Sequence, residues 1–324
     1  MAGVARKVLS AVELTRTSMA FGAITDLWLI VILSRTRPEY HYMPVATMPL
    51  AQALAASAVI AVGLFAFGAT LNDLLDARRD RVFSPRRPLA AGDLGGTQAL
   101  TVALGSLLIA IAGALLFGSG ALLITLLVAG GLVFYNGAGK YIPGVGIMTI
   151  GLLHAAHMLI PNDQFTFTLP AWLAMTHALV VAAAVHVLQG KRPPLSWRAI
   201  ASVIAGWIAW SSILIGLGVM RSSGSFWPSD APLWGALLPV LAAAGFGAVL
   251  LRKIPRALTP QIAAAKVARY GALWQSVYAA SWLFAWGQFG WGLIALVMAA
   301  FAFGLTIAVK EVSTALHDPL GFRG

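Results

Sequence analysis

Residues 47–92 read TMPLAQALAASAVIAVGLFAFGATLNDLLDARRDRVFSPRRPLAAG, an apolar stretch that changes abruptly into a charged one. The 25 residues 47–71 contain no charged side chain, and about 20 apolar residues make a helix long enough to cross a bilayer. The pattern predicts a membrane helix that carries a polar segment at one end.

Apolar stretches of this length recur along the chain. Of its 324 residues, 59% are hydrophobic and 10% are charged, whereas a soluble domain has roughly 25% charged residues. This composition predicts an all-α integral membrane protein that forms one polytopic domain over 1–324, with a transmembrane bundle at 19–320. We expect ten spans, near 19–34, 47–71, 97–116, 119–135, 142–160, 169–188, 199–220, 232–251, 268–286 and 289–308.

The basic residues lie almost entirely on one side of these spans. Only Arg35, Arg37 and Arg221 fall on the other side, which leaves 19 of the 22 lysines and arginines together. Basic residues gather on the cytoplasmic side of membrane proteins. The net charge of +11 is therefore explained better by the orientation of the spans in the membrane, and by contact with anionic lipid and an anionic substrate, than by binding to nucleic acid. We expect the protein to lie in a bacterial inner membrane. The chain has no cysteine, which excludes disulfides and thiolate metal sites.

Acidic residues concentrate directly after the second predicted span, in the segment NDLLDARRD. On a continuing helix Asn72, Asp76 and Asp80 are spaced by four residues and share a face, which Asp73 joins. Carboxylates so close together repel each other. Mg²⁺ removes this repulsion, because it takes oxygen ligands and commonly binds through carboxylates and substrate phosphates. We therefore predict that Asn72, Asp76 and Asp80 bind Mg²⁺.

Two arginines follow the acids in the segment SPRRPLAAG, where Arg86 and Arg87 are placed to clamp a diphosphate by bidentate hydrogen bonds. The other interpretation is a solvated loop in which arginines simply pair with the acids. Four of the 11 acidic residues of the chain lie within this loop, and this concentration favours the interpretation of residues 72–96 as a cytoplasmic active-site loop. Its candidate catalytic residues are Asn72, Asp73, Asp76 and Asp80.

NDLLDARRD followed by RRPLAAG resembles the N-D-x-x-D-x-x-x-D … R-P-L-x-x-G signature of the UbiA superfamily of intramembrane prenyltransferases. The resemblance extends to Leu14-Thr15-Arg16 before the first span and to YNGAGK, residues 135–140, after the fourth. It covers roughly residues 10–200, and beyond them only the hydropathy matches. The resemblance implies a bundle of nine transmembrane helices around a central cavity, against the ten spans that hydropathy suggests.

The resemblance also implies the ligands. Members of the superfamily hold a polyprenyl diphosphate through Mg²⁺ and transfer its isoprenyl group to a lipophilic acceptor. A basic residue after their fourth span contacts the diphosphate, and Lys140 matches it. The other residues expected to bind substrate are Arg16, Arg86, Arg87, Tyr135, Asn136, His154, His157, His186, Lys191 and Arg192.

The chain departs from the superfamily pattern after its sixth span. There the superfamily has a second acidic motif, so that Mg²⁺ is bridged between two motifs. Residues 184–194, AVHVLQGKRPP, contain no carboxylate. Either one metal site remains, or Lys191 and Arg192 neutralise the diphosphate directly in place of a second metal.

Ionisable residues inside the predicted spans are candidates for function, because they are costly in a bilayer. His154 and His157 share one face of the fifth span. They either hydrogen-bond to a neighbouring helix or line the cavity, where they orient the acceptor or accept its proton. Asp26 in the first span either has a structural polar partner or lines the cavity.

The sequence thus predicts a Mg²⁺-dependent prenyltransferase that moves an isoprenyl group from a polyprenyl diphosphate to an apolar, aromatic acceptor within the membrane. One alternative keeps the ionisation of the diphosphate and leads to a terpene cyclase or a lipid-phosphate transferase. The other alternative is a membrane protein that binds an isoprenoid lipid without reacting it.

Overall fold

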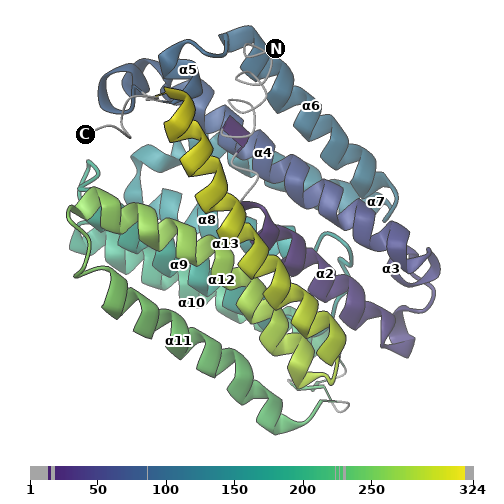
Figure 1. The fold of residues 1–324 in the computed structure, drawn as a ribbon. Coiled ribbons are helices and arrows are strands. Elements are labelled where there is room, and N and C mark those ends of the chain that lie inside the picture. The colour runs from purple at the N-terminus through teal and green to yellow at the C-terminus, as the bar shows by residue number, and fades with distance from the viewer. Residues whose placement is uncertain are drawn as a thin grey trace.

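The computed structural model describes residues 14–15, 19–85, 87–222, 224–225, 227–228 and 231–317. Within them, ten helices of 15 or more residues form a bundle (Figure 1). These are α2 (Phe21–Arg35), α4 (Leu50–Phe83), α6 (Gly96–Leu115), α7 (Ser119–Gly137), α8 (Pro143–Met158), α9 (Leu169–Leu188), α10 (Trp197–Arg221), α11 (Leu237–Lys253), α12 (Pro260–Ala285) and α13 (Phe289–His317). The short elements between them are η2 (Pro38–Tyr40), α3 (Pro44–Thr47), α5 (Pro88–Ala91), η3 (Gly139–Tyr141) and η4 (Leu233–Ala236).

Each of the ten expected spans corresponds to one of these long helices. Seven of the described helices are long and apolar enough to cross a membrane by length and composition: α4, α6, α7, α9, α10, α11 together with η4, and α13. By contrast, α2 and α8 have only 15 and 16 residues, and α12 carries Lys266 and Arg269 near its start. The all-helical membrane bundle is confirmed, and the count of nine or ten spans agrees roughly.

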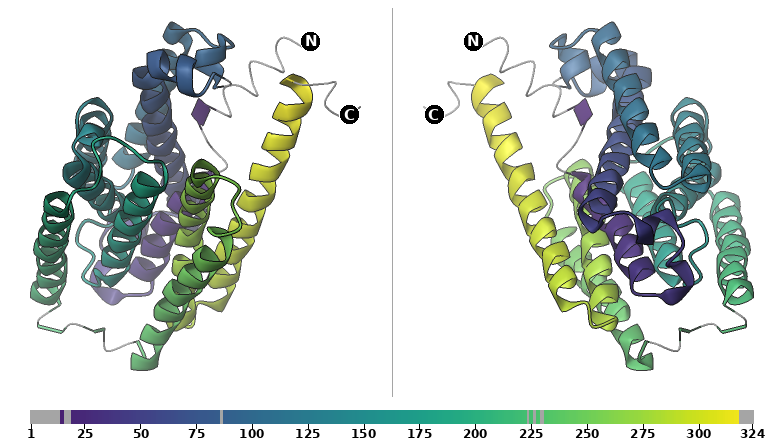
Figure 2. Two further views of the ribbon diagram at one scale, coloured as in Figure 1. Left: turned by 90° about the vertical axis from the view of Figure 1, so that its left-hand side faces the viewer. Right: turned by 90° about the vertical axis from the view of Figure 1, so that its right-hand side faces the viewer.

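Two helices, α4 and α12, organise the packing. α4 contacts α2, α6 and α7, whereas α12 contacts α2, α9, α11 and α13. α8 joins the two groups through its contacts with α2, α7, α9 and α10. Figure 2 shows the helices from two sides, and α13 lies along the outside of the bundle in both views.

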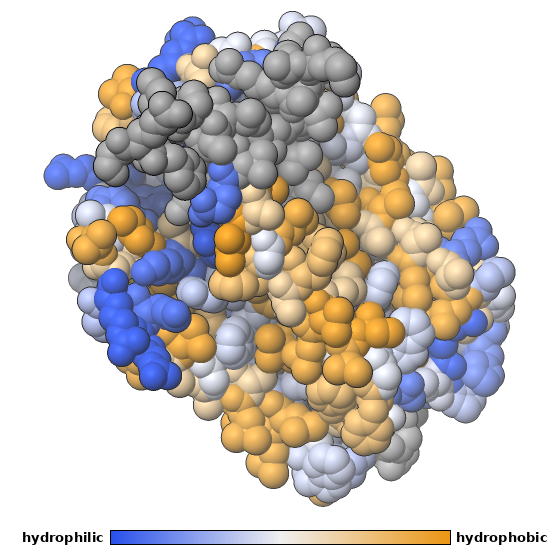
Figure 3. Space-filling model, in the orientation of Figure 1, coloured by the Kyte–Doolittle hydropathy of each residue, from blue (hydrophilic) through white to orange (hydrophobic). Residues whose placement is uncertain are grey.

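The bundle has an apolar middle and two polar ends, which Figure 3 shows on one face. We call one of them the charged end: α4, α7, α9 and α11 end there, and α6, α8, α10 and α12 begin there. We call the opposite end the far end. Apolar side chains exposed on α10, α11 and α13 suit contact with lipid tails, since a bilayer rewards apolar surface where water would penalise it.

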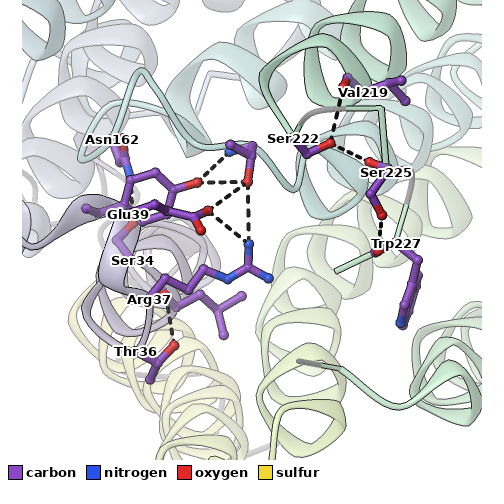
Figure 4. A network of polar contacts seen from close by, with 12 residues as sticks. Ser34, Thr36, Arg37, Glu39, Asn162, Val219, Ser222, Ser225 and Trp227 are labelled. Atoms are coloured by element: carbon purple, nitrogen blue, oxygen red, sulfur yellow. Dashed lines mark hydrogen bonds and ion pairs between the residues drawn. The ribbon is translucent and has the colours of Figure 1, made fainter. Parts of the chain in front are cut away.

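Polar contacts close the far end by joining the last turn of α2 and the loop after it to the loop between α8 and α9. The Tyr40 hydroxyl donates to Thr166 Oγ1 at 2.9 Å, and Asn162 Nδ2 donates to Ser34 Oγ at 2.8 Å (Figure 4). Arg37 is only 5% exposed and pairs with Glu39 at 3.5 Å. Among the described residues, neutral hydrogen bonds and the Arg37–Glu39 ion pair therefore hold the far end.

The contact between α4 and α6 depends on glycine. A Cβ added at Gly63 would lie 2.6 Å from the Ser106 carbonyl oxygen and 2.9 Å from Ala110 Cβ. Gly105 lies on α6, and a Cβ added there would meet nothing within 4 Å. We expect Gly63→Ala to destabilise the protein by about 1–3 kcal/mol, as overpacking does. Gly105→Ala should be neutral or stabilising, because alanine favours a helix over glycine.

Thermal unfolding of both variants in lipid nanodiscs measures this difference. The Gly105→Ala variant controls for the change in helix propensity, which is the same at the two positions. Equal melting temperatures for the two variants would contradict the close α4–α6 contact.

Candidate active site

The polar segment after the second predicted span is helical in its first part. α4 runs from Leu50 to Phe83, 34 residues, and the Ser84 amide still donates to the Asp80 carbonyl at 2.8 Å. Pro85 follows, and its ring disfavours a helical conformation at the preceding residue. The acidic motif therefore lies on the last turns of α4, as its spacing on a continuing helix predicts, and α4 ends at Phe83 within the segment 72–96.

Within the described part of the chain, two cations from other segments, Arg87 and Lys140, hold the carboxylates of this helix. Arg87 Nη1 contacts Asp73 Oδ1 at 3.2 Å and Asp80 Oδ2 at 2.6 Å. Lys140 Nζ contacts Asp76 Oδ1 at 2.8 Å. Asn72 Nδ2 donates to Asp73 Oδ1 at 3.3 Å. The acids thus form two groups, with Asp73 and Asp80 on one cation and Asp76 on the other.

Local structure explains how Arg87 reaches α4. Arg87 is the N-cap of α5, and Pro88 occupies the first helical position, where proline is favoured. α5 ends at Gly92 with φ +81°, a left-handed conformation that suits glycine. This single helical turn reverses the chain after α4 and brings the guanidinium back onto the acidic face.

The donor set fits Mg²⁺ by its chemistry, because carboxylate and amide oxygens are the ligands that this ion prefers. Among the described residues, however, no three His, Cys, Asp or Glu side chains gather as a metal-binding group. Binding would need carboxylates to exchange a cation partner for the metal. The assignment of Asn72, Asp76 and Asp80 as metal ligands stays a prediction.

Lys140 enters the site from η3, the turn between α7 and α8. Its side chain is 10% exposed and that of Asp76 is 13% exposed, so this ion pair is less screened than one at a free surface. Asn136 lies just before the turn, and its Nδ2 donates to the Leu132 carbonyl at 2.9 Å. Asn136 is buried and packs toward α4, while Tyr135 beside it is half-buried.

Lys191, after α9, is coupled electrostatically to the same ion pair. Burial lowers the pKa of Lys191 from its ordinary value of 10.5, and the cations of Arg79 and Lys140 lower it further, while the Asp76 carboxylate raises it. These influences place the Lys191 ammonium group within electrostatic range of Asp76 and Lys140. Its neighbour Arg192 is exposed.

The predicted histidines have different places. His186 Nε2 donates to the Pro193 carbonyl at 3.0 Å and so holds the segment after α9 against its helix. His154 and His157 lie roughly 16 and 21 Å along α8 from its start at the charged end, at 1.5 Å per residue. The structure therefore separates them from the acidic motif. Arg16 and Arg86 lie outside the described residues.

Arg79 is a neighbour of the site that the sequence interpretation does not include among the substrate-binding residues. It lies three residues after Asp76 on α4 and influences Lys191 electrostatically. Its position on the same helix as the acids is the available signal, since residues three apart are neighbours on a helix surface. From the sequence alone, Arg79 reads only as a counter-ion of the acids.

Neither the models of known protein families nor the sequences of curated proteins match the chain. Solved structures do. A structure of digeranylgeranylglyceryl phosphate synthase in membranes has a TM-score of 0.53 and 18% identity, with 86% of this chain and 98% of that chain covered. A UbiA homologue from Archaeoglobus fulgidus bound to GPP and Mg²⁺ has a TM-score of 0.46 and 15% identity, with 91% and 98% covered. An apo UbiA homologue from Aeropyrum pernix K1 has a TM-score of 0.43 and 18% identity, with 90% and 98% covered.

At these identities the likeness concerns the fold. It extends over most of the chain, including the part beyond residue 200, where only hydropathy indicates a relation. The acidic motif forms the last turns of α4, the second long helix. The chain is an all-helical integral membrane protein that shares its fold with the structure of digeranylgeranylglyceryl phosphate synthase.

Proposed function

We propose that the protein is a Mg²⁺-dependent intramembrane prenyltransferase that moves an isoprenyl group from a polyprenyl diphosphate to a lipophilic, aromatic acceptor. The observation that carries this proposal is the acidic end of α4, where cations from two other segments hold three carboxylates that are 4 to 13% exposed. We also propose that the whole chain is one membrane domain with its charged end in the cytoplasm, as the distribution of basic residues favours.

The same groups suit a metal and a diphosphate. Asn72, Asp73, Asp76 and Asp80 would hold Mg²⁺, which supplies electrostatic stabilisation to the diphosphate as a leaving group. Arg87 and Lys140 donate to the diphosphate oxygens when the carboxylates release them. Arg87 offers a planar fork that matches phosphate geometry, and Lys140 acts as a point charge.

In the proposed reaction the bond between the isoprenyl C1 and the diphosphate oxygen breaks, and the bonding electrons leave with the diphosphate. Arg87 and Lys140, once the carboxylates have released them, stabilise the negative charge that develops there. A carbon or oxygen atom of the acceptor then bonds to C1, and the acceptor loses a proton. The apolar bundle excludes water, which would otherwise capture the carbocation.

Lys191 adds a third cation to Arg87 and Lys140, at the place where the superfamily has its second acidic motif. Its ammonium group lies near Asp76 and Lys140, and the adjoining stretch 184–194 has no carboxylate. A diphosphate bound there would relieve the repulsion among these cations. We therefore favour one metal site, with Lys191 and Arg192 doing part of the work of a second metal.

One observation favours a second candidate function. The carboxylates already have cation partners in the structure, so the acidic motif is electrostatically balanced without a metal. A protein that binds an isoprenoid diphosphate lipid without reacting it would have this property. Turnover of a labelled prenyl donor separates it from a prenyltransferase.

Asp76→Asn should reduce pyrophosphate release by at least about 100-fold, the cost of removing one preorganised electrostatic contact to a reacting group. The assay uses the protein in nanodiscs with radiolabelled geranyl, farnesyl or geranylgeranyl diphosphate, Mg²⁺ and a membrane lipid extract. Asp163→Asn is the control, because Asp163 lies in the loop between α8 and α9 at the far end. Labelled product formed without the extract would indicate a cyclase. Binding without turnover of any donor would indicate the second candidate function.

The double variant Lys191→Gln/Arg192→Gln should weaken Mg²⁺-dependent binding of farnesyl diphosphate about tenfold or more, as loss of charge-assisted hydrogen bonds does. The matched control is Arg252→Gln/Lys253→Gln, which removes the same charge from the exposed end of α11, also at the charged end. Equal affinities of the two double variants would show only general attraction and would refute the role of Lys191 and Arg192.

The pKa of Lys191 gives a test that needs no substrate. A lowered pKa makes the neutral amine present at lower pH, so acetylation of Lys191 should be half-maximal below pH 10.5. Asp76→Asn should move the midpoint lower still, because the Asp76 carboxylate raises this pKa. Mass spectrometry of the peptide across a pH series measures both shifts. An upward shift in the variant would mean that Lys191 does not face Asp76.

A further inference from the structure

The turn between α11 and α12 carries a group of cations that takes no part in the diphosphate site. We call them the α11–α12 cations: Arg252 and Lys253 at the end of α11, Arg256 in the turn, and Lys266 and Arg269 in the first three turns of α12. Figure 3 shows hydrophilic side chains gathered at the left of the molecule, where α11 ends and α12 begins in the same view of Figure 1. The cations therefore form a surface patch at the charged end.

The protein supplies no carboxylate to this patch. The sequence has no acidic residue between Asp230 and Glu311, and Glu311 is exposed on α13. Among the described residues, no side chain forms an ion pair or a hydrogen bond with the α11–α12 cations. By contrast, Arg87 and Lys140 at the acidic motif are paired with carboxylates. The positive charges of the patch repel each other, and an external anion would relieve this repulsion.

The two helices place their cations at a similar depth. Trp274 on α12 marks a common level, because its Nε1 donates to the Ala242 carbonyl of α11 at 2.8 Å and its ring lies 5.6 Å from that of Phe246. Arg252 lies roughly 9 Å beyond Phe246 along α11, toward the charged end, at 1.5 Å per residue. Lys266 lies roughly 12 Å before Trp274 along α12, toward the same end. One headgroup layer of a bilayer therefore reaches the cations of both helices.

Exposed apolar side chains alternate with these cations along the chain. Leu251 is 80% exposed, Leu258 is 94% exposed and Ile262 is 41% exposed. Such exposure is costly in water but favourable where acyl chains meet headgroups. Lys266 and Arg269 are only partly exposed, as expected of long side chains whose stems lie along an apolar surface while their charged ends reach the headgroups. The patch therefore suits the membrane interface better than bulk water.

The chemistry of the patch indicates its partner. Clusters of about four to eight Lys and Arg side chains at the cytoplasmic end of a membrane helix are typical of anionic lipid binding. α11 packs chiefly on α12 and exposes Val240 and Leu241 on its membrane-spanning part, where acyl chains would lie. We infer that the α11–α12 cations bind the phosphate group of an anionic phospholipid from the leaflet at the charged end, so that one headgroup joins α11 to α12. This inference does not depend on the proposed prenyl transfer.

Native mass spectrometry of the delipidated full-length protein tests this inference. It measures the affinity for the first bound molecule of dioleoyl phosphatidylglycerol, with dioleoyl phosphatidylcholine as the lipid without net charge. The wild-type protein should bind phosphatidylglycerol about tenfold more tightly than phosphatidylcholine. Lys266→Gln/Arg269→Gln should weaken the binding of phosphatidylglycerol about tenfold or more, because each cation near an anionic lipid contributes about fivefold. Binding of phosphatidylcholine should stay within about twofold of wild type.

A second variant and a matched control complete the experiment. Arg252→Gln/Lys253→Gln removes two exposed cations of the same patch, should have the same effect, and decides the test if the first variant is not monodisperse in gel filtration. The control is Arg78→Gln/Arg81→Gln, which removes two exposed cations from the end of α4, also at the charged end and also three residues apart. The control should bind phosphatidylglycerol within about twofold of wild type, because it leaves the patch intact.

Two outcomes of the binding experiment would overturn the inference. An equal loss of affinity in the control and in the patch variants would show only a general attraction between net charges. Equal affinity of the wild-type protein for the two lipids would show that the patch does not recognise a lipid headgroup and would leave it to a soluble acidic partner.

Thermal unfolding in nanodiscs measures whether the headgroup joins the two helices. A ligand that binds only the folded protein raises its melting temperature. Adding phosphatidylglycerol to phosphatidylcholine nanodiscs should therefore raise the melting temperature of the wild-type protein and of the control more than that of the two patch variants. Equal shifts in all these proteins would contradict a stabilising contact at the patch.

Discussion

The neutralisation of three carboxylates at the end of a membrane helix is the constraint on which the charged end depends. Asp73, Asp76 and Asp80 are nearly buried, and an isolated buried charge is too costly to persist. Arg87 and Lys140 meet this requirement from α5 and η3. The ion pairs of these two cations thereby fix the turn after α4 and the turn between α7 and α8 against the same helix.

Hydropathy predicts the bundle well, because an apolar run long enough to cross a bilayer has few other uses. It places the start of α12 too late, at 268, whereas the helix begins at Pro260. Lys266 and Arg269 interrupt the apolar run that hydropathy detects. The boundary signal is nevertheless present, since Thr259 is an N-cap whose side chain accepts from the Ile262 amide and is followed by proline.

The acidic motif is also visible in the sequence, but its pairing is not. Spacing by four groups Asn72, Asp76 and Asp80 on one face, whereas the structure pairs Asp73 with Asp80 through Arg87. Residues seven apart also face the same way, because seven residues make nearly two turns. The choice between these groupings depends on where α5 and η3 bring their cations. Lys140 is 64 residues from Asp76, and helical periodicity carries no information at that distance.

The cations grouped around Asp76 determine which kind of ligand the site favours. Arg79 and Lys140 both disfavour the charged form of Lys191, so the protein without ligand bears a repulsion among its own cations. The charge of a metal ion would be present only after the metal binds. The charges of these side chains repel each other before any ligand binds. An anion relieves that repulsion and gains hydrogen bonds at once. The cations of Arg79, Lys140 and Lys191 would therefore favour a multiply charged anion over a neutral lipid headgroup in the proposed site.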